Sequence, residues 1–321
     1  MKALVTGGAG FIGSHLVEKL LRDGHRVTVV DDLSTGSLNN LQSVKGNKSF
    51  SFVQDSVRNT QTMDVLIKQC DVVYHLAAAV GVQLIVDEPV RTIETNIHGC
   101  EVVLEAANRY GRKVLIASSS EIYGKSEAVP FSEDDDAVLG STRFARWSYA
   151  CSKAIDEFLA FAYRDQFNLP VIVARIFNTI GPRQTGRYGM VVPRFVESAI
   201  KNKPVVIYGT GKQTRCFAHV SDVVGGLVAL MESSEAAGGV YNIGSDEEVT
   251  IEALADKIIE LAGSRSKKKH LSYEQAYGKA VDDMMRRVPS LEKIKAVTGY
   301  EPKMSLEQTL RSVIEDVKSK L

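Results

Sequence analysis

Lys2-Ala3-Leu4-Val5-Thr6-Gly7-Gly8-Ala9-Gly10-Phe11-Ile12-Gly13 indicates the fold of the chain that follows it. Residues 2–6 are mostly apolar and predict a short buried strand. After the glycines, Ile12, Leu16 and Leu20 recur at the spacing of one helix face. The stretch therefore predicts a strand, a glycine turn and a helix in succession, which is the context that a dinucleotide-binding turn requires.

Each glycine of this turn has a physical role. Gly7 permits a tight turn, Gly10 lets the backbone approach a pyrophosphate, and Gly13 lets the helix pack closely on the sheet. The first N–H groups of the helix have no partner within it, so they attract the phosphates. The predicted cofactor contacts of this stretch are Gly7, Gly10, Phe11, Ile12 and Gly13.

A second predicted strand, residues 26–30, ends at Asp31-Asp32. A carboxylate at this strand end accepts hydrogen bonds from the 2′-hydroxyl of an adenosine ribose, and it repels a 2′-phosphate. The sequence therefore favours NAD over NADP. Both carboxylates are predicted cofactor contacts, with Asp31 preferred because Asp32 could begin the next turn.

The alternation of strand and helix continues along the chain. Apolar runs predict strands at residues 51–54, 72–76, 113–117 and 171–175, and helical periodicity covers residues 63–69, 92–108 and 149–165. This alternation predicts an α/β fold, a doubly wound parallel sheet with helices on both faces. Ligands of such a fold bind beyond the carboxyl ends of the strands.

Further cofactor contacts are predicted near these strand ends. Asp55 follows the third strand and is expected near the adenine. Small residues after the fourth strand let a cofactor lie against the backbone, and Asn96 is expected to brace the active-site helix. The predicted contacts are Asp55, Leu76, Ala77, Ala78 and Asn96, and Tyr149 and Lys153 are predicted to contact the cofactor as well. His75 lies inside the apolar strand and is interpreted as a core histidine.

Two motifs carry the predicted chemistry. Residues 118–124 follow a predicted strand and offer Ser119 and Glu121. Tyr149 and Lys153 are four residues apart, so they share one face of a predicted helix. The lysine ammonium favours the phenolate form of Tyr149. A phenolate beside a serine hydroxyl takes a proton from a substrate alcohol while a cofactor takes the hydride.

A second Tyr-x-x-x-Lys pattern, Tyr208 and Lys212, predicts no such pair. Gly209 and Gly211 break any helix there, so the two side chains need not share a face.

Composition excludes several classes of protein. The 321 residues carry 39 basic and 39 acidic side chains, so no net charge attracts nucleic acid or an anionic membrane. No apolar stretch approaches the roughly 18 residues that span a bilayer, and we expect no signal peptide. The scattered Cys70, Cys100, Cys151 and Cys216 suggest reduced thiols in a cytoplasmic protein and no metal site.

Two charged runs are interpreted as solvated surface. Glu133-Asp134-Asp135-Asp136 lies in a loop that contains Pro and Gly, and Lys267-Lys268-Lys269 lies in a predicted loop over residues 264–270. Runs of like charge usually face solvent, so no functional role is predicted for either.

Four motifs together resemble the extended short-chain dehydrogenase/reductases that act on nucleotide sugars. They are residues 6–13, His75-Leu76-Ala77-Ala78, Tyr149-x-x-x-Lys153 and Arg175-Ile176-Phe177-Asn178. The resemblance covers essentially the whole chain. It implies that Ser119, Tyr149 and Lys153 hold and deprotonate a sugar hydroxyl while NAD⁺ takes the hydride. It also implies that Asn178 and Arg215 line the pocket for the nucleotide diphosphate.

The resemblance further implies a domain organisation and partners. Residues 1–174 would form the NAD-binding Rossmann domain, and residues 175–321 would form most of a smaller C-terminal α/β domain for the nucleotide sugar. The chain is expected to recross to the first domain around residues 190–240. The expected partners are a UDP-sugar substrate and a second copy of the chain, with the Tyr149 helix in the dimer interface.

The neighbourhood of Glu121 distinguishes the reactions of this family. Ser120-Glu121 resembles the Thr-Ser-Glu of UDP-glucuronate decarboxylases, and GDP-mannose dehydratases share the Ser-Glu pair. Residues 146–149, 211–217, 277–279 and 286–290 resemble the decarboxylase domain of the bacterial enzyme of 4-amino-arabinose synthesis. Two positions depart from the pattern, because Ser119 replaces a Thr and Thr214 replaces a Lys.

The resemblance therefore implies a decarboxylation. Oxidation at C4 places a ketone β to the C5 carboxylate, and a β-keto acid loses CO₂ through an enolate. Ser119 and Tyr149 could stabilise the oxyanion, and Glu121 could guide the proton that returns to C5. The implied substrate contacts are Ser119, Ser120, Glu121, Asn178, Val191, Arg215, Tyr277 and Arg287.

We accordingly predict an NAD-dependent UDP-glucuronate decarboxylase that forms UDP-xylose or a UDP-4-keto-pentose. The alternatives are a UDP-hexose 4-epimerase, in which Glu121 would only be a polar wall, and an NDP-sugar 4,6-dehydratase. A non-catalytic NAD-sensing protein of the same fold would carry a damaged Ser, Tyr and Lys set, and here that set is intact.

Overall fold

The computed structural model describes residues 1–186, 190–277 and 284–320. Within them a seven-stranded sheet has the order β11-β6-β5-β4-β1-β2-β3. Its strands are β1 (Lys2–Thr6), β2 (Arg26–Val30), β3 (Phe50–Val53), β4 (Val72–His75), β5 (Lys113–Ser119), β6 (Val171–Ile176) and β11 (Val240–Ile243). Neighbouring strands pair in parallel, with Thr6 opposite both Val30 and His75. The carboxyl ends therefore meet at one edge of the sheet.

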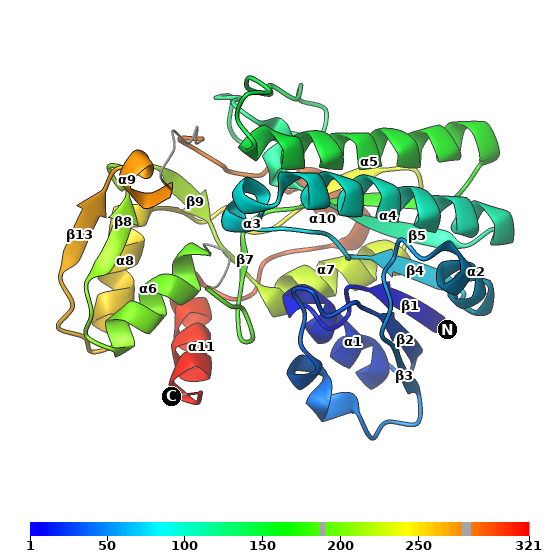
Figure 1. Ribbon diagram of the computed structural model, residues 1–321, viewed down its shortest axis with the longest axis horizontal. Coiled ribbons are helices and arrows are strands. Elements are labelled where there is room, and N and C mark those ends of the chain that lie inside the picture. Colours follow the sequence, from blue (N-terminus) through cyan, green and yellow to red (C-terminus); the bar gives the residue numbers. More distant parts are fainter. Residues whose placement is uncertain (187–189, 278–283, 321) are drawn as a thin grey trace.

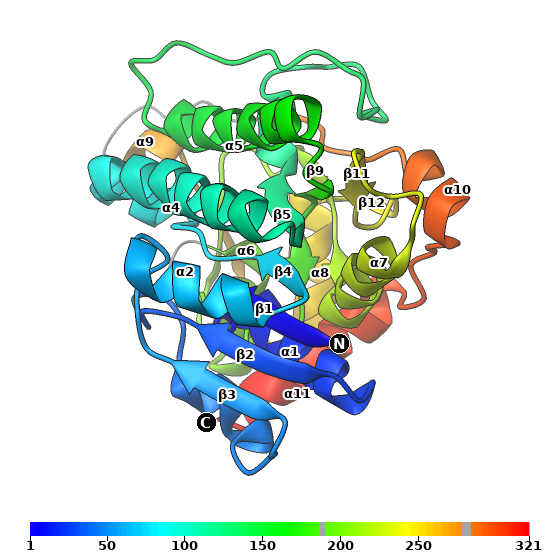
Figure 2. The ribbon, with the colours of Figure 1, turned by 90° about the vertical axis from the view of Figure 1, so that its right-hand side faces the viewer.

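Helices cover both faces of this sheet (Figures 1 and 2). One face carries α1 (Phe11–Arg22), α7 (Val220–Glu232) and α10 (Glu292–Thr298); the other carries α2 (Thr60–Gln69), α3 (Val82–Asp87), α4 (Pro89–Tyr110) and α5 (Arg146–Phe167). The predicted doubly wound α/β fold is confirmed. The boundaries differ by a few residues, because Pro89 starts α4 and Gly111, with φ 61°, ends it.

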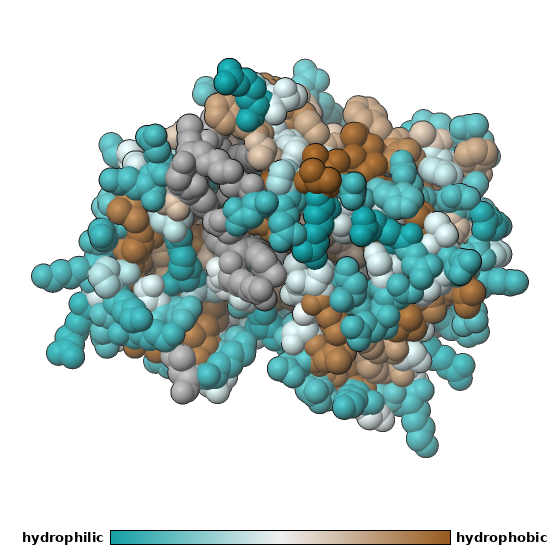
Figure 3. Space-filling view, viewed as in Figure 1, coloured by the Kyte–Doolittle hydropathy of each residue, from teal (hydrophilic) through white to brown (hydrophobic). Residues whose placement is uncertain are grey.

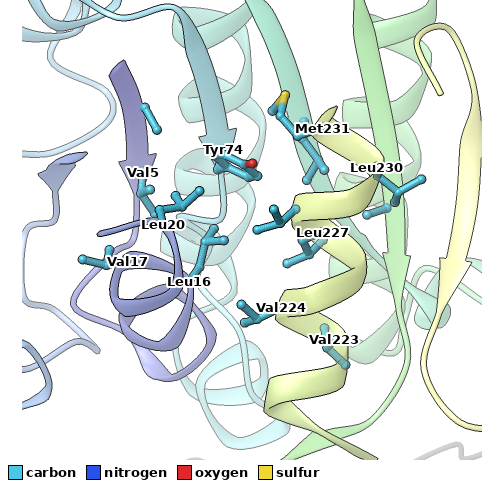
Figure 4. Packing of buried hydrophobic residues seen from close by; sticks show 14 of the residues in the cluster. Val5, Leu16, Val17, Leu20, Tyr74, Val223, Val224, Leu227, Leu230 and Met231 are labelled. Atoms are coloured by element: carbon cyan, nitrogen blue, oxygen red, sulfur yellow. The ribbon is translucent and has the colours of Figure 1, made fainter. Parts of the chain in front are cut away.

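Alternate residues of each strand supply the two cores. Val5 and Tyr74 point to the α1 and α7 side, whereas Leu4 and Val73 point to the α2 and α4 side. Figure 4 shows the first of these cores, in which Leu16, Leu20 and Leu227 approach Val5 and Tyr74. Both faces of the strands are buried, which explains why the strands are apolar runs rather than alternating ones.

A second, smaller group of elements lies beside the strand ends (Figure 1). It comprises α6 (Val191–Ile200), β8 (Val205–Tyr208), α8 (Ile251–Leu261), β13 (Lys268–Leu271), α9 (Tyr273–Tyr277) and α11 (Leu306–Lys318). Its own core contains Phe195, Ile207, Leu254 and Leu310. Between α6 and α8 the chain returns to the large sheet as α7, and β11 joins β6. The predicted domain boundary at residue 174 stays a prediction.

The described residues also form several short elements. They are the 3-10 turns η1 (Leu38–Val44) and η2 (Ser120–Tyr123), the parallel pair β7 (Thr179–Ile180) and β10 (Ala218–His219), and the antiparallel pair β9 (Thr214–Cys216) and β12 (Glu248–Thr250).

The prediction of a loop over residues 264–270 is wrong in part. Lys268 begins β13, which pairs in parallel with β8. Its ammonium group lies 2.5 Å from a carboxylate oxygen of Glu252 and 2.7 Å from one of Asp256. These ion pairs offset the repulsion of the neighbouring lysines, so the basic run can form an edge strand.

The described residues contain no helix that is both long and apolar enough to cross a membrane. All four cysteines lie in the described ranges and are free thiols. Within the same ranges, no three His, Cys, Asp or Glu side chains gather closely enough to hold a metal ion.

Candidate active site

The carboxyl ends of the strands open onto a cleft of about 850 Å³ between the two groups of elements. Residues predicted from distant parts of the sequence line this cleft. They are Gly7, Gly10, Phe11, Ile12, Gly13, Asp31, Asp32, Asp55, Leu76, Ala77, Ala78, Ser119, Ser120, Glu121, Tyr149, Lys153, Asn178, Val191, Arg215 and Arg287. Asn96 does not line the cleft. Tyr277 ends α9, and residues 278–279 of its motif lie outside the described residues.

The glycine turn packs so closely on neighbouring backbone that larger residues would not fit. Gly7 has a φ of +69°, and a Cβ there would lie 2.8 Å from the backbone nitrogen of Ala77. A Cβ on Gly13 would overlap the carbonyl oxygen of Gly7. Among the described residues, no side chain caps α1, and its first turn contains no acidic residue. Its N–H groups are therefore open to an anion.

Asp31 faces this turn from the end of β2. Its carboxylate accepts hydrogen bonds from the backbone N–H groups of Ala9 at 2.9 Å and Leu33 at 2.8 Å. Burial raises the pKa of Asp31, and these two hydrogen bonds lower it in part. Asp32 accepts a hydrogen bond from the backbone of Ser34 at 2.9 Å. Two carboxylates at this position suit a ribose with free hydroxyl groups and oppose a 2′-phosphate.

Asp55 borders the same end of the cleft. Its carboxylate accepts hydrogen bonds from the Thr62 hydroxyl at 2.6 Å and the Asn59 amide at 2.8 Å. These bonds, together with one from the backbone of Ser56, lower the pKa of Asp55. The side chain is therefore ionised and fixed at the N-terminus of α2. The glycine turn, the open helix end and these carboxylates together fit a dinucleotide.

Asn96, a predicted cofactor contact, has its side chain engaged within the protein, and its contact with a cofactor stays a prediction. Its amide oxygen accepts a hydrogen bond from the backbone N–H of Ala79 at 2.8 Å, and its amide nitrogen donates to the Ser152 hydroxyl at 3.1 Å. Asn96 is only 1% exposed. It therefore ties the loop after β4 to α5, which is the bracing role that the sequence suggested.

Tyr149 and Lys153 both lie on the face of α5 that borders the cleft, and both are buried. Ser119 ends β5, and its hydroxyl accepts a hydrogen bond from the backbone of Glu121 at 3.2 Å. Burial raises the pKa of Tyr149, while Lys153 and Ser119 lower it in part. Lys153 thus shifts the pKa of Tyr149 in the expected direction, but burial has the larger effect, so the pKa is raised overall.

Arg287 brings the C-terminal part of the chain to the same place. Its guanidinium donates to the Glu121 carboxylate at 2.6 Å and contacts the Asn178 amide oxygen at 3.5 Å. The residue is 5% exposed, and its Nε has no hydrogen-bond partner among the described residues. The site therefore contains a buried guanidinium that is paired with Glu121 and whose Nε makes no hydrogen bond to a described residue.

The segment that carries Arg287 is fixed on two sides. Phe131 pairs with it, since its N–H donates to Val288 and its carbonyl accepts from Ser290, both at 2.8 Å. On the other side, the N–H of Thr214 donates to Met285 at 2.9 Å. These backbone bonds hold Arg287 against Glu121.

The far end of the cleft carries residues that sequence reasoning missed. Arg215 was predicted and is buried there, donating to the carbonyl of Thr214 at 2.7 Å. The additional lining residues there include Arg194, Tyr208, Gln213 and Tyr273. Arg183 also lines the cleft but lies beside α1, where it donates to the Ser14 hydroxyl at 3.1 Å and to the Glu18 carboxylate at 2.6 Å. Gln213 lies within a motif that the sequence had singled out, so the signal was present. Tyr273 had no such signal, because it comes to the cleft only through α9.

The second Tyr-x-x-x-Lys pattern is not helical, as expected. Tyr208 ends β8, and Gly209 and Gly211 each have a φ of +73°. Tyr208 lines the cleft with the Arg194 guanidinium 3.9 Å from its ring centre.

Beneath Ser119 lies a buried polar cluster that the sequence did not reveal. Glu157 of α5 accepts hydrogen bonds from the Ser118 hydroxyl and from the Arg175 guanidinium, the latter at 2.8 Å. Arg175 also donates to the Tyr123 hydroxyl at 3.1 Å, and that hydroxyl donates to Asn242 at 2.6 Å. The cluster therefore links α5 to β5, β6 and β11 directly under the catalytic strand end.

The interpretation of residues 133–136 as solvated surface is wrong for Glu133. This side chain is 6% exposed and accepts a hydrogen bond from the backbone of Asn242 at 2.7 Å. Its carbonyl accepts from Arg175 at 2.9 Å. Glu133 is buried because β11, which is distant in sequence, supplies its partner.

Comparisons with known proteins agree with this geometry. The family model described as GDP-mannose 4,6 dehydratase matches residues 4–313. The chain is 41% identical over 315 residues to a UDP-N-acetyl-alpha-D-glucosaminuronate decarboxylase of Bacillus cytotoxicus, covering 98% of this chain and 97% of that protein. It is 38% identical over 320 residues to UDP-glucuronic acid decarboxylase 1 of Xenopus tropicalis, covering 100% of this chain and 73% of the relative.

Solved structures show the same fold over the full length. A UDP-glucuronic acid 4-epimerase of Bacillus cereus, in complex with UDP-glucuronic acid and NAD, superposes with a TM-score of 0.90 at 30% identity. The alignment covers 100% of both chains.

Proposed function

The chain belongs to the GDP-mannose 4,6-dehydratase family of extended short-chain dehydrogenase/reductases, and we propose that it is an NAD-dependent decarboxylase of a UDP-linked hexuronic acid. UDP-glucuronate is the first candidate substrate. Its 2-acetamido counterpart is the second, favoured by the identity of 41% to an enzyme named for that substrate.

The contact between Arg287 and Glu121 carries this proposal. A buried guanidinium beside the end of β5, paired with the single carboxylate of Glu121 and with an Nε that has no hydrogen-bond partner among the described residues, suits a substrate carboxylate. The carboxylate would then lie close to Ser119 and Tyr149, which act at the neighbouring sugar hydroxyl.

The proposed reaction uses four side chains, those of Tyr149, Ser119, Glu121 and Arg287. Tyr149 accepts the proton of the C4 hydroxyl, and Ser119 holds that hydroxyl in place. When bound, the NAD⁺ cofactor supplies hydride acceptance at C4. The resulting ketone lies β to the carboxylate, so the C5–carboxylate bond breaks and its electron pair moves to the C4 oxygen.

The enolate that forms needs stabilisation and then a proton. Ser119 and Tyr149 donate hydrogen bonds to the oxygen on which charge develops. Glu121 guides the proton that returns to C5. Arg287 binds the carboxylate until CO₂ leaves. Residues 1–174 would supply the cofactor site, and later residues, including Asn178, Val191, Arg215 and Tyr277, would bind the UDP portion.

NAD is the proposed cofactor. The glycine turn and the uncapped N-terminus of α1 would hold its pyrophosphate, and Asp31 and Asp32 would accept hydrogen bonds from its adenosine ribose.

A product assay tests the function. Purified protein with NAD⁺ is offered UDP-glucuronate, the 2-acetamido uronate and UDP-glucose in parallel, and CO₂ and the UDP-sugars are measured. Release of CO₂ from a uronate supports the proposal and identifies the substrate. Conversion of a uronate to its 4-epimer without CO₂ would refute it in favour of a 4-epimerase, the activity named for the Bacillus cereus neighbour.

Replacement of Arg287 by Met is expected to lower kcat/KM for the uronate by about 10²-fold, because a desolvated ion pair with the substrate is lost. Affinity for UDP alone should change little. The matched control is Arg286→Met: Arg286 is the adjacent residue, pairs with Glu248 at 2.8 Å and does not line the cleft. Equal losses in both variants would contradict the assignment of Arg287 to the carboxylate.

We also propose a homodimer through α4 and α5 and a cytoplasmic location. Large apolar side chains are exposed on these two adjacent helices, including Phe158 at 75%, Val90 at 67% and Phe167 at 49%. Figure 3 shows an apolar area over this part of the molecule. A second copy would bury that surface. The free thiols suit a reducing compartment.

Phe158→Glu is expected to convert the dimer to a monomer, because a carboxylate would be buried in the apolar interface. Light scattering after gel filtration measures the mass. Val65→Glu is the control, since Val65 is 53% exposed on α2 and belongs to neither α4 nor α5. A Phe158→Glu protein with the mass of the wild type would contradict the interface.

A further inference from the structure

A second buried charge lies next to Lys153. The Lys153 ammonium donates to the Asp156 carboxylate at 2.9 Å, and the two side chains are only 3% and 0% exposed. A buried ion pair is weak evidence for stability, because desolvation of both groups offsets their attraction. Its presence on the cleft face of α5 therefore calls for another explanation.

The spacing places the lysine between two groups. Tyr149, Lys153 and Asp156 follow one another at four and three residues, so all three share one face of α5. The ammonium has three donors, and one of them is used by Asp156. The carboxylate thus fixes the position of the ammonium while leaving two donors for the cleft.

The other titratable groups around this pair are either neutral or paired with a cation, although the charge of Glu121 still contributes to the raised pKa of Tyr149. His75 of β4 is buried, which lowers its pKa to about 3 and leaves the ring neutral. Burial raises the pKa of Cys100 of α4, so its thiol is also neutral. Glu157 is neutralised by Arg175 at 2.8 Å, and Glu121 by Arg287 at 2.6 Å.

We propose that Asp156 is a positioning residue for the proton transfer: its carboxylate holds the Lys153 ammonium charged and in place, and thereby sets the pH range in which Tyr149 works. This inference rests on the proposed role of Tyr149 as proton acceptor. It assigns to Asp156 no contact with the substrate.

The electrostatics agree in direction. Burial opposes the charge on Lys153, but Asp156 and Tyr149 outweigh it and raise the pKa of Lys153. Asp156 also acts on the phenol, where its negative charge contributes to the raised pKa of Tyr149, after burial and the charge of Glu121. Burial raises the pKa of Asp156 itself, and Lys153 lowers it in part.

Asp156→Asn keeps the shape of the side chain and removes the charge. The phenolate is then favoured, so the pKa of Tyr149 should fall and the acidic limb of the kcat profile should move to lower pH. Lys153 loses its carboxylate partner in a buried site, so its pKa should also fall and the alkaline limb should move to lower pH. The whole profile is expected to shift toward acid, with severalfold less activity on the alkaline side.

The test uses substrate-free enzyme labelled with ¹³C at the tyrosine ζ carbon, in which Tyr149→Phe identifies the Tyr149 signal among the 11 tyrosines. The titration of Tyr149 should move to lower pH in Asp156→Asn and stay unchanged in Asp165→Asn. That control makes the same change of charge on α5 at a carboxylate that is 65% exposed. An unchanged Tyr149 titration in Asp156→Asn would overturn the proposal.

Asp156→Glu is a second variant that retains the charge. It is expected to keep the wild-type titration but to lower kcat, since the ammonium is displaced. If the Tyr149 titration shifted as far in Asp156→Glu as in Asp156→Asn, the proposal would be refuted. The Tyr149 titrations of both variants need no turnover, so absence of CO₂ production by the wild type would refute the decarboxylase without deciding on Asp156.

Discussion

Tyr149→Phe is expected to lower kcat by about 10³-fold, because the variant loses the group that exchanges a proton with the sugar hydroxyl. The phenol lies on the cleft face of α5, beside Lys153 and across from the end of β5. No other described tyrosine lies four residues before a lysine on the same helix. The ring itself remains, so packing and the affinity for NAD should be retained.

The measurement is single-turnover kinetics, together with the affinity for the cofactor and the melting temperature. Tyr163→Phe is the control on the same helix, because Tyr163 packs on Phe167 and does not line the cleft. It should retain kcat within about twofold, as expected for a substitution away from the reacting atoms. A Tyr149→Phe enzyme with more than a tenth of the wild-type rate would assign the proton transfer to another group.

Arg175→Met is expected to lower the free energy of unfolding by about 3–5 kcal/mol, because it leaves the buried Glu157 carboxylate without its cation. The two side chains are 10% and 5% exposed, and the pair is 2.8 Å apart. Arg175 also donates to Tyr123 and to the carbonyl of Glu133, and both acceptors would lose a partner.

Urea unfolding measures this loss. The double variant Arg175→Met, Glu157→Met is expected to be more stable than Arg175→Met alone, because removing both charges also removes the unpaired carboxylate. If the double variant loses the sum of the two single losses, the charges act independently and the buried pair is not the cause. In the single variant kcat should fall as well, because the Ser119 strand end loses its support.

The sequence alone determined the fold and the cofactor end of the cleft, because the signals there are local. The glycine turn requires residues without a Cβ within a single strand–turn–helix segment, as the close approach of Gly13 to Gly7 demonstrates. Asp31 follows its strand directly. The parallel sheet then places all such strand ends at one edge, so residues predicted one by one converge without further information.

Only the tertiary structure decided which polar side chains meet. Glu121 and Arg287 are 166 residues apart, and nothing in either segment names the other as partner. Glu133 looked like one member of an acidic surface run until β11 supplied its backbone N–H. The type of a residue shows whether its side chain is polar or charged. Whether that side chain is buried, and which group it pairs with, depends on which helices and strands the fold brings together. Those contacts join residues that are far apart in the sequence, so the periodicity and spacing of residues within one segment do not predict them.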